Sequence, residues 1–414
     1  MSTEKTQSEK FRQLAEQTRQ HLTERIIPFW EKLKDDEYGG YTGFMGTDLK
    51  TDPKAVKGCI LNSRILWFFA RAFNELQDQS LLPYAAHAYE FMQRYCVDRE
   101  YGGVFWSVTY DGQPYDTTKH TYNQAFAVYA LSEYYEASGD EEVYRLARSL
   151  FEVIEDRCRD EGGYKEAMDR RFQPAENDKL SENGVLADRT MNTLLHLLEA
   201  YTNLYRVHGD EDVKARLVWV LREFADRVWN PELGRLEVFF DQDMHSLIDL
   251  YSYGHDIEAS WLIDLALEVL DGAGTLKQDR NDWEVLRTRL AEMTDTMADQ
   301  LLRVAFDGHS LPLECEKGVV EETRVWWVQA ETVLGFLNAW LKHPERTDYA
   351  DAACSCWEFI RDDIVDSRPE GEWFAAATKD GVPDMEKPIV EPWKCPYHNG
   401  RMCLEIMRRR KTAG

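Results

Sequence analysis

Residues 37–43 read EYGGYTG, and the same kind of glycine-centred turn, followed by a short extended piece, recurs along the chain. The later copies are EYGGVFW at 100–106, EGGYKEA at 161–167, ELGRLEVF at 232–239, FDGHSLPLE at 306–314 and GEWFAAA at 371–377. A small polar residue then precedes an apolar run with helical spacing; these residues are Asn62, Asn123, Asn192, Asp256, Gln329 and Asn399. Because Asn and Asp side chains satisfy free N–H groups at helix N-termini, we expect each of these residues to mark a helix start.

The polar marks return at intervals of about 60 to 75 residues, which is the length of a helical hairpin with its loops. Six hairpins in series could form an open solenoid or a closed ring. The repeats lack the short regular period of a solenoid, which favours closure. We therefore predict an all-α (α/α)6 barrel with short β pieces in its loops. Residues 1–414 are expected to form a single catalytic domain, with frayed tails at roughly 1–10 and 409–414.

Composition limits the class of partner. The 414 residues carry a formal net charge of −26, whereas nucleic acids and anionic membranes select a surplus of Lys and Arg. No apolar signal core or membrane span is present, and the eight cysteines form no CxxC pair, which indicates reduced thiols in a cytoplasmic protein. No HExxH, GxGxxG or Walker loop occurs, so we expect neither a metal nor a cofactor.

The six marks predict which residues face the mouth of the ring. The residues one before each mark are Leu61, Tyr122, Met191, His255, Val328 and His398. The residues two after each mark are Arg64, Ala125, Leu194, Glu258, Glu331 and Arg401. Residues three apart share a helix face, so two histidines, two arginines and two glutamates gather at one level. Buried charge is costly unless it is paired, and its concentration here indicates a functional site.

The two histidines occur in parallel settings, YGHD and PYHN, each just ahead of a helix. The partial positive charge at a helix N-terminus helps to keep an imidazole neutral, whereas nearby carboxylates act in the opposite direction. A matched pair of this kind suits two-base proton transfer at carbon. A single histidine such as His87 or His245 is more simply a hydrogen-bonded core residue, and for His196 both interpretations stay open.

Aromatic residues near the predicted mouth suggest a sugar ligand, because flat rings stack on the C–H faces of pyranoses. Four tryptophans are candidates for this role by their place in the repeat, namely Trp326, Trp327, Trp373 and Trp393. Other tryptophans, such as Trp67 and Trp219, lie inside apolar helical runs and are expected in the core.

Six stretches together resemble the cellobiose 2-epimerases, a group within the N-acylglucosamine 2-epimerase superfamily. They are KGCILNSRILWFFA, TKHTYNQAFAVYALSEYYEASGD, MNTLLHLLEAYTNLYR, SYGHDIEASWL, WWVQAETVLGFLNA and WKCPYHNGRMCLEI, and the likeness runs from about Ile26 to Arg408. The resemblance implies an (α/α)6 barrel and epimerisation at C2 of the reducing-end glucose of β-1,4-linked disaccharides. Cellobiose would become glucosyl-mannose, and lactose would become epilactose.

The resemblance also implies roles for individual residues. His255 and His398 would be the catalytic acid/base pair, Arg64 would steady the developing oxyanion, and Glu258 would orient His255. The residues expected to hold or pack against the sugar are Tyr122, Asn192, His196, Trp327, Glu331, Trp373 and Trp393. One departure from the family pattern is Leu194, where a histidine is common, so the details of binding beside His196 are in doubt.

The chemistry can be stated from the residues alone. An aldose opens to its aldehyde, one histidine removes the C2 proton to give a cis-enediolate, and the other returns a proton to the opposite face. A mannose 2-epimerase or an aldose–ketose isomerase would use the same histidines on monosaccharides. An inverting glycosidase would instead use Glu258 and Glu331 as acid and base. The expected partner is a small disaccharide, with no nucleic acid or membrane, and the protein is expected to be a monomer or homodimer.

Overall fold

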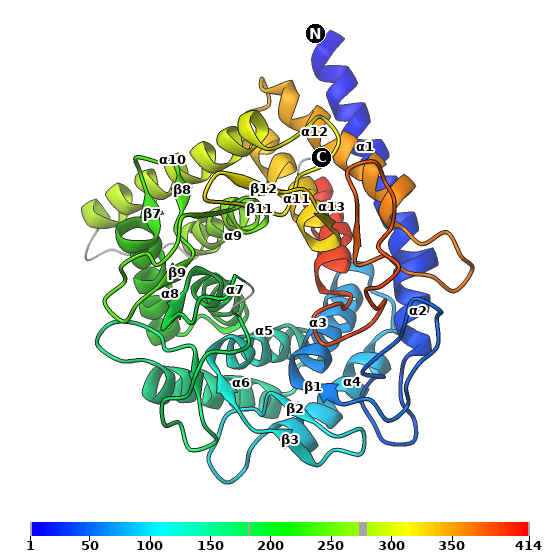
Figure 1. The fold of residues 1–414 in the computed structure, drawn as a ribbon, viewed down its shortest axis with the longest axis vertical. Helices are drawn as coiled ribbons and strands as arrows, with labels where there is room; N and C mark the ends of the chain where they lie inside the picture. The colour runs from blue at the N-terminus through cyan, green and yellow to red at the C-terminus, as the bar shows by residue number, and fades with distance from the viewer. Residues whose placement is uncertain (1, 181–182, 273–279, 413–414) are drawn as a thin grey trace.

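The computed structural model describes residues 2–180, 183–272 and 280–412, and across these residues the helices form a closed ring of two layers (Figure 1). The inner layer consists of α3 (Cys59–Leu76), α5 (Thr121–Ser138), α7 (Met191–His208), α9 (Tyr253–Gly272), α11 (Trp326–Lys342) and α13 (Tyr397–Thr412). Each inner helix packs against its neighbours in the ring, and α13 packs against α3 to close it. This arrangement confirms the predicted (α/α)6 barrel.

Inner helices are buried on almost every side, because they have inner neighbours on both flanks and the outer layer behind them. In α3, every residue from Cys59 to Ala70 is buried. This explains why the inner segments read as nearly continuous apolar runs. None of the helices in the described residues is both long and apolar enough to cross a membrane.

The outer layer contains α1 (Ser2–His21), α2 (Ile27–Lys32), α4 (Leu82–Phe91), α6 (Glu141–Val153), α8 (Glu211–Glu223), α10 (Arg280–Val304) and α12 (Thr347–Phe359). These helices are amphipathic: the buried residues of α6 include Val143, Ala147 and Leu150, at the spacing of one helix face. Short π-helical turns extend this layer; they are η1 (Leu22–Ile26), η2 (Met92–Cys96), η3 (Ile154–Cys158), η4 (Phe224–Val228) and η5 (Ile360–Ile364).

The two ends of the chain complete the ring, since α1 packs against both α12 and α13. We predicted frayed tails at roughly 1–10 and 409–414, but residues 2–10 and 409–412 are helical, and one residue in each segment is packed against the ring. Gln7 is buried and donates to Asp351, and Arg409 is buried and donates to Asn338 at 2.7 Å. The physical reason is that each terminal helix is a full member of one layer, with a neighbouring helix on which to bury its face.

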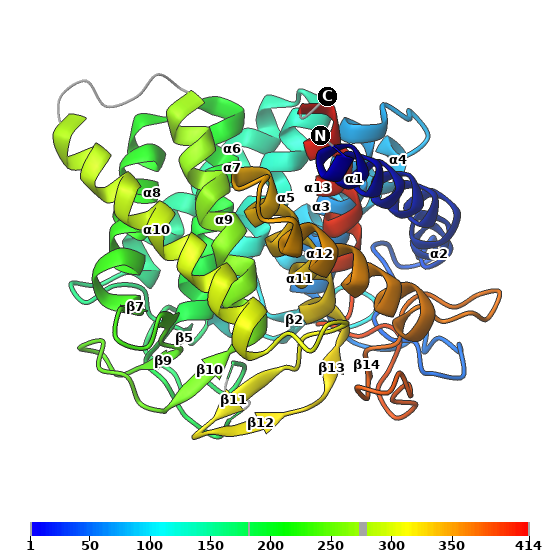
Figure 2. The same ribbon diagram turned by 90° about the horizontal axis from the view of Figure 1, so that it is seen from above.

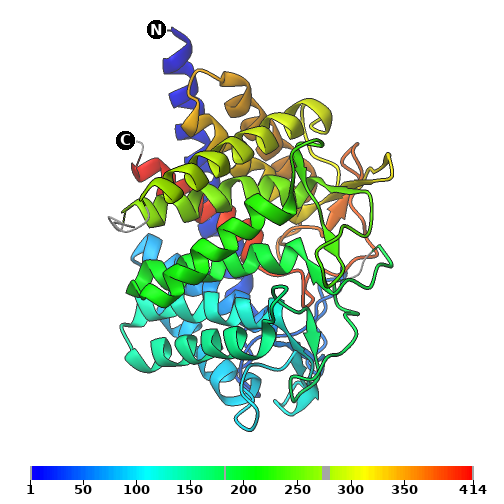
Figure 3. The ribbon, with the colours of Figure 1, turned by 90° about the vertical axis from the view of Figure 1, so that its left-hand side faces the viewer.

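The strands lie together at the end of the barrel where the inner helices begin (Figures 2 and 3). Two antiparallel sheets have three strands, β1 (Lys57–Gly58), β2 (Ser107–Val108) and β3 (Pro114–Asp116), and β10 (Leu250–Ser252), β11 (Glu314–Glu316) and β12 (Val319–Glu321). The remaining pairs are β4 (Lys119–His120) with β5 (Ala167–Met168), β6 (Arg189–Thr190) with β9 (Phe239–Phe240), β7 (Trp229–Asn230) with β8 (Arg235–Leu236), and β13 (Arg324–Val325) with β14 (Ala376–Ala377). These pairs are the predicted short β pieces, and they build the rim of the mouth.

The glycine turns are docked onto the inner helices that follow them. Gly40 and Gly103 have φ of 65° and 72°, in the left-handed region that favours glycine. The Oδ1 atom of Asn62 accepts the N–H of Tyr41 at 3.0 Å, and a Cβ on Gly40 would lie only 2.7 Å from that oxygen. Close approach of the helix therefore requires glycine at this point of the turn.

The polar marks are not helix caps, and that prediction is wrong. The N-cap positions of α3 and α5 are Gly58 and His120, so Asn62 and Asn123 lie inside the first turn. Side chains from this turn reach back to the preceding loop, as Asn62 does to Tyr41 and Asn123 does to Phe105. In the second repeat the bond that corresponds to that of Asn62 is made by Gln124, whose Oε1 accepts from Val104 N at 2.7 Å, so the repeat frame is displaced by one residue there.

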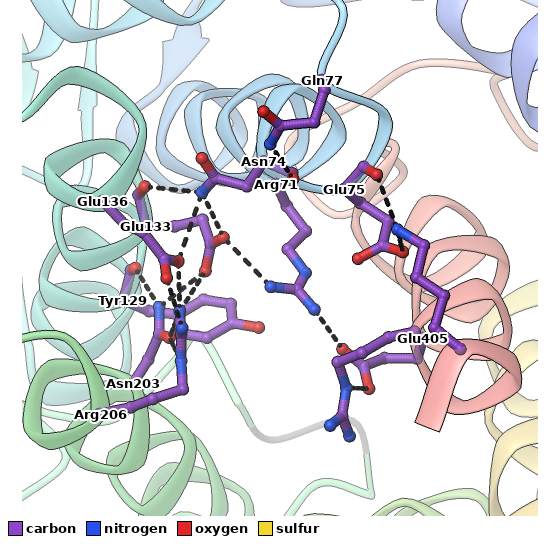
Figure 4. Close-up of polar contacts among 12 residues, drawn as sticks. Arg71, Asn74, Glu75, Gln77, Tyr129, Glu133, Glu136, Asn203, Arg206 and Glu405 are labelled. Atoms are coloured by element: carbon purple, nitrogen blue, oxygen red, sulfur yellow. Dashed lines mark hydrogen bonds and ion pairs between the residues drawn. The ribbon is translucent and has the colours of Figure 1, made fainter. Parts of the chain in front are cut away.

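At the opposite end of the barrel, a buried charge network ties four inner helices together (Figure 4). Arg71 of α3 pairs with Glu133 of α5 at 3.5 Å and with Glu405 of α13 at 3.2 Å. Arg206 of α7 reaches Glu133 at 3.1 Å. These residues line a cavity of about 590 Å³. Because both of these glutamates already have arginine partners, we assign the network to closure of the ring.

Candidate active site

The candidate site is a cavity of about 260 Å³ at the strand-bearing mouth of the barrel, and all six inner helices of the described chain contribute to its lining. Ten of the twelve predicted site residues line it: Arg64, Tyr122, Asn192, His196, His255, Glu258, Trp326, Trp327, Trp393 and His398. The structure thus brings together side chains that are more than 300 residues apart in sequence.

Five of the six inner helices place one residue each at the same position along the helix. Counted from the helix start, the sixth residues of α3, α5, α7, α9 and α11 are Arg64, Phe126, His196, Glu258 and Glu331. Our sequence frame placed Ala125 and Leu194 in this ring, which is wrong because the marks in α5 and α7 precede the true positions. His196 belongs to the ring instead. Leu194 lies beside Trp219, away from the cavity, so the departure from the family pattern does not alter the lining.

His255 is held by a hydroxyl group. Its Nδ1 lies 2.7 Å from Ser252 Oγ, and its ring centroid lies 4.9 Å from that of Trp327. Burial, assisted by the nearby His196, lowers the pKa of His255 to about 3, so the imidazole is neutral at neutral pH. We predicted that Glu258 orients His255, but in the described residues no hydrogen bond joins them, since Glu258 turns toward an arginine.

His398 is held by a carboxylate. Its Nδ1 lies 2.7 Å from Glu331 Oε1, and its ring centroid lies 5.4 Å from that of Trp327. Burial, with a further contribution from Arg401, holds the pKa of His398 well below its usual range. Both candidate acid/base groups are therefore neutral, and both lie beside Trp327.

Glu331 lies behind His398 and does not line the cavity, so it is not placed to hold a sugar as we predicted. Three donors surround its carboxylate: His398, Arg401 at 2.7 Å and the indole N–H of Trp261 at 2.9 Å. Burial raises the pKa of Glu331, while Arg401 and the hydrogen bonds act to lower it. The geometry of donors on every side favours the ionised carboxylate.

Arg401 gathers the buried carboxylates at the floor of the site. It pairs with Glu199, Glu258 and Glu331. Burial, reinforced by the charge of Glu331, raises the pKa of Glu258 to about 7 even though Arg401 opposes the shift. Glu258 Oε2 is buried and has no hydrogen-bond partner among the described residues. Since Glu258 lines the cavity, this oxygen is available to a substrate hydroxyl.

Arg64 has the opposite environment, because it forms no ion pair with any carboxylate in the described residues. Its Nη2 donates to the hydroxyl of Tyr122 at 2.7 Å. The guanidinium carbon lies 4.1 Å from the ring centroid of Phe126 and 4.8 Å from that of Tyr397. An arginine that is 2% exposed, surrounded by aromatic rings and facing a cavity, is a ready partner for a negatively charged oxygen.

Two further lining residues offer polar atoms to a ligand. Asn192 Oδ1 is buried and has no hydrogen-bond partner within the part of the chain that the structure describes. His196 Nδ1 lies 3.0 Å from Glu199 Oε2, which leaves its other nitrogen for the cavity. Trp326 and Trp393 add aromatic walls. This combination of few polar groups and several aromatic faces is typical of a carbohydrate site.

We predicted that Trp373 packs against the sugar, but the structure places it away from the cavity. It is fully buried in the outer layer, where its indole N–H lies 2.7 Å from His21 Nε2, and it does not line the cavity. Trp373 pairs with Val365 in an isolated antiparallel bridge directly after η5, and its side chain is buried there.

Sequence reasoning missed Ser252 and Glu199, which hold His255 and His196. Each lies three residues from its histidine, at 252 against 255 and 199 against 196. In α7 that spacing places Glu199 and His196 on one helix face, which was an available signal. Ser252 is the last residue of β10, directly before α9, so helix spacing did not identify it.

Glu258, Glu331 and His398 offer potential metal-ligand atoms within 4.8 Å of one another. Arg401 already supplies positive charge to both of these carboxylates. The short separation also argues against an inverting glycosidase, whose carboxyl groups stand about 6.5–9.5 Å apart to admit a water. The arrangement instead supports proton transfer by the two histidines.

Comparison with known proteins places the chain among sugar epimerases. Residues 39–399 match the family described as N-acylglucosamine 2-epimerase (GlcNAc 2-epimerase). A cellobiose 2-epimerase from Eubacterium cellulosolvens is 50% identical over 403 residues, covering 94% of this chain and 96% of that protein. One from Dictyoglomus turgidum is 44% identical over 390 residues, covering 94% and 97%.

Solved structures agree with this placement. A sugar epimerase from a ruminal bacterium superposes with a TM-score of 0.91 at 48% identity, covering 96% of this chain and 99% of that one. A cellobiose 2-epimerase from Bacillus thermoamylovorans gives 0.90 at 42% identity, covering 96% and 100%. A D-mannose isomerase gives 0.76 at 16% identity, with 96% and 98% covered, and shares the fold.

Proposed function

We infer the function of this chain from one premise, that it belongs to the N-acylglucosamine 2-epimerase family. We propose that it epimerises C2 of the reducing-end glucose of β-1,4-linked disaccharides, converting cellobiose to glucosyl-mannose and lactose to epilactose. One observation carries the proposal: two neutral histidines, His255 and His398, share a cavity with Arg64, a buried guanidinium that no carboxylate in the described residues neutralises.

The reaction begins when the sugar ring opens to its aldehyde, which acidifies the C2 hydrogen. One neutral histidine takes that proton, and the electron pair of the C–H bond forms the C1–C2 double bond of a cis-enediolate. The charge moves to the carbonyl oxygen, where Arg64 stabilises it. Such a preorganised donor contributes on the order of 10²–10³-fold to kcat.

The second half of the reaction reverses these steps on the other face. Rotation about C2–C3 presents the opposite face of the enediolate to the other histidine. This histidine takes up a proton from water and gives it to C2, while the first histidine returns the proton that it removed to water. The aldehyde forms again and the ring closes. Each positioned proton transfer contributes on the order of 10²–10⁴-fold.

The cavity supports sugar binding without further groups. Trp327 and Trp393 offer faces for stacking, while Asn192 and His196 offer polar atoms to hydroxyl groups. We further propose one catalytic domain, a monomer or homodimer, and a cytoplasmic location, which the eight free thiols support.

Incubation with cellobiose in D₂O tests the proposal. We expect deuterium at C2 of both cellobiose and its epimer, and we expect lactose to behave alike. Parallel incubation with mannose separates the alternatives: if free mannose is converted to glucose or to a ketose while both disaccharides stay unlabelled, the enzyme acts on monosaccharides. A His398→Asn variant is expected to lose epimerisation while keeping the wild-type circular dichroism spectrum.

A further inference from the structure

The two histidines are held by chemically different partners at the same distance. Ser252 Oγ lies 2.7 Å from His255 Nδ1, and Glu331 Oε1 lies 2.7 Å from His398 Nδ1. Both partners are buried, with Ser252 at 3% exposure and Glu331 at 0%. Because Nδ1 of each ring is occupied and each histidine lines the cavity, Nε2 is the nitrogen that remains for substrate.

An ionised carboxylate only accepts hydrogen bonds, so Glu331 requires a proton on Nδ1 of His398. Neutral His398 then presents the lone pair of Nε2 to the cavity, which is the form of a base. Arg401 and Trp261 also donate to Glu331, which leaves it no role as a donor. His398 is therefore prepared to take a proton, and its imidazolium would be stabilised by the carboxylate.

A serine hydroxyl can donate or accept, so Ser252 permits both neutral tautomers of His255. When Ser252 accepts from Nδ1–H, His255 has its Nε2 lone pair in the cavity and can act as a base. When Ser252 donates to Nδ1, Nε2 carries the proton and cannot accept another. Ser252 therefore orients the ring but does not fix its tautomer.

We propose that Ser252 is a positioning residue for His255, as Glu331 is for His398, and that each acts only on the half-reaction of its own histidine. The inference rests on the proposed function. In each half-reaction the C2–H bond breaks, its proton passes to Nε2, and its electron pair forms the enediolate double bond. The Nδ1–H of the resulting imidazolium is accepted by Ser252 Oγ or by the Glu331 carboxylate, and protonation of C2 reverses these transfers.

A two-base epimerase allows the half-reactions to be measured separately. If one base is removed, the other still exchanges the C2 proton of the epimer that it serves, although epimerisation stops. We therefore compare the initial rates of C2 deuterium incorporation, in D₂O, into recovered cellobiose and recovered glucosyl-mannose. His255→Asn and His398→Asn identify which epimer depends on which histidine.

Against that reference, Ser252→Ala is expected to slow exchange about tenfold or more for the epimer that His255→Asn silences, and by less than about threefold for the other. Glu331→Gln is expected to show the mirror pattern with a loss of about 100-fold or more, because an amide can donate to Nδ1 and impose the wrong tautomer. Ser252→Cys, which keeps a weak donor and acceptor, should give an intermediate loss on the same epimer as Ser252→Ala.

Ser260→Ala is the matched control. Ser260 is a buried serine of the same helix as His255, but its hydroxyl donates to the Ile257 carbonyl at 2.7 Å. We expect exchange of both epimers to stay at the wild-type rate. The inference would be overturned if Ser252→Ala and Ser252→Cys each slowed C2 exchange of the two epimers by the same factor, while both variants kept the wild-type unfolding transition. Absence of any exchange in the wild-type enzyme would overturn the proposed function instead.

Discussion

Arg64→Met gives the most direct test of the catalytic site, because it removes a charge while keeping an apolar side chain of similar length. The guanidinium makes one strong hydrogen bond, to Tyr122, and two long ones, to Trp393 O at 3.5 Å and Cys395 Sγ at 4.0 Å. Its faces pack against aromatic rings. Methionine can keep much of that packing. The positive charge facing the cavity and the hydrogen bond to Tyr122 are lost completely.

The substitution is expected to have a large effect on kcat and a small effect on the free energy of unfolding. Loss of an oxyanion partner should lower kcat by about 10²–10³-fold, which corresponds to about 2.7–4 kcal/mol of transition-state stabilisation. The free energy of unfolding should change by less than about 2 kcal/mol, because the lost hydrogen bond is offset by relief from burying a charge without a counter-ion.

Chromatographic assay of cellobiose epimerisation and urea unfolding measure the two quantities. Arg401→Met is the comparison variant: Arg401 is as buried as Arg64 but faces three carboxylates, so its loss should cost about 3–5 kcal/mol of unfolding free energy. An Arg64→Met enzyme with kcat within threefold of wild type would refute the role of Arg64. If both variants lost the same unfolding free energy, the conclusion that Arg401 is paired with carboxylates and Arg64 is not would be refuted.

Three other predictions follow from the packing. Trp373→Phe should leave kcat and KM within about twofold of wild type but lower the unfolding free energy by about 1–3 kcal/mol, since the indole contacts His21 rather than the cavity; a tenfold rise in KM would return it to the sugar site. Gly103→Ala should lower the unfolding free energy, measured in urea, more than Gly139→Ala does. Both glycines have positive φ, but only a Cβ at Gly103 would meet a neighbour, Gln124 Oε1 at 2.8 Å. Equal losses would show that backbone strain alone sets the cost. Burial raises the pKa of Glu166 from 4.5 to about 8, so this group stabilises the folded state below pH 4.5 and loses that contribution as the pH rises to 8. The unfolding free energy of Glu166→Gln relative to wild type should therefore increase between pH 5 and pH 8. A difference that stays constant over this range would contradict the raised pKa.

The fold was predictable because its signals are local. The turn glycines and the apolar helical runs recur at a regular interval along the sequence. In each repeat the inner helix is apolar on all sides because it is buried on all sides. The position of the repeat within each helix was harder to predict: Gln124 makes the bond to the turn that corresponds to that of Asn62, while the neighbouring Asn123 donates to Phe105 O. Two adjacent polar residues both bond the preceding loop, and only the structure shows which of them takes the equivalent place.

The site was predictable where its chemistry is carried by the residue itself. His255, His398 and Arg64 were identified from their settings, and all three line one cavity. The partners of these residues were not. Glu331 was predicted to hold sugar but stands behind His398, and Ser252 was not considered, because hydrogen-bond partners depend on where side chains from different helices meet.

By itself, the sequence determined the ring of helical hairpins, the acidic surface and the histidines at the inner helix starts, since composition and periodicity are properties of the chain. Tertiary structure alone decided which charges are paired. Arg64 and Arg401 are equally buried, yet one faces aromatic rings and the other faces three carboxylates. The free energy of a buried charge depends on its neighbours in space, and those neighbours come from helices that are distant in sequence.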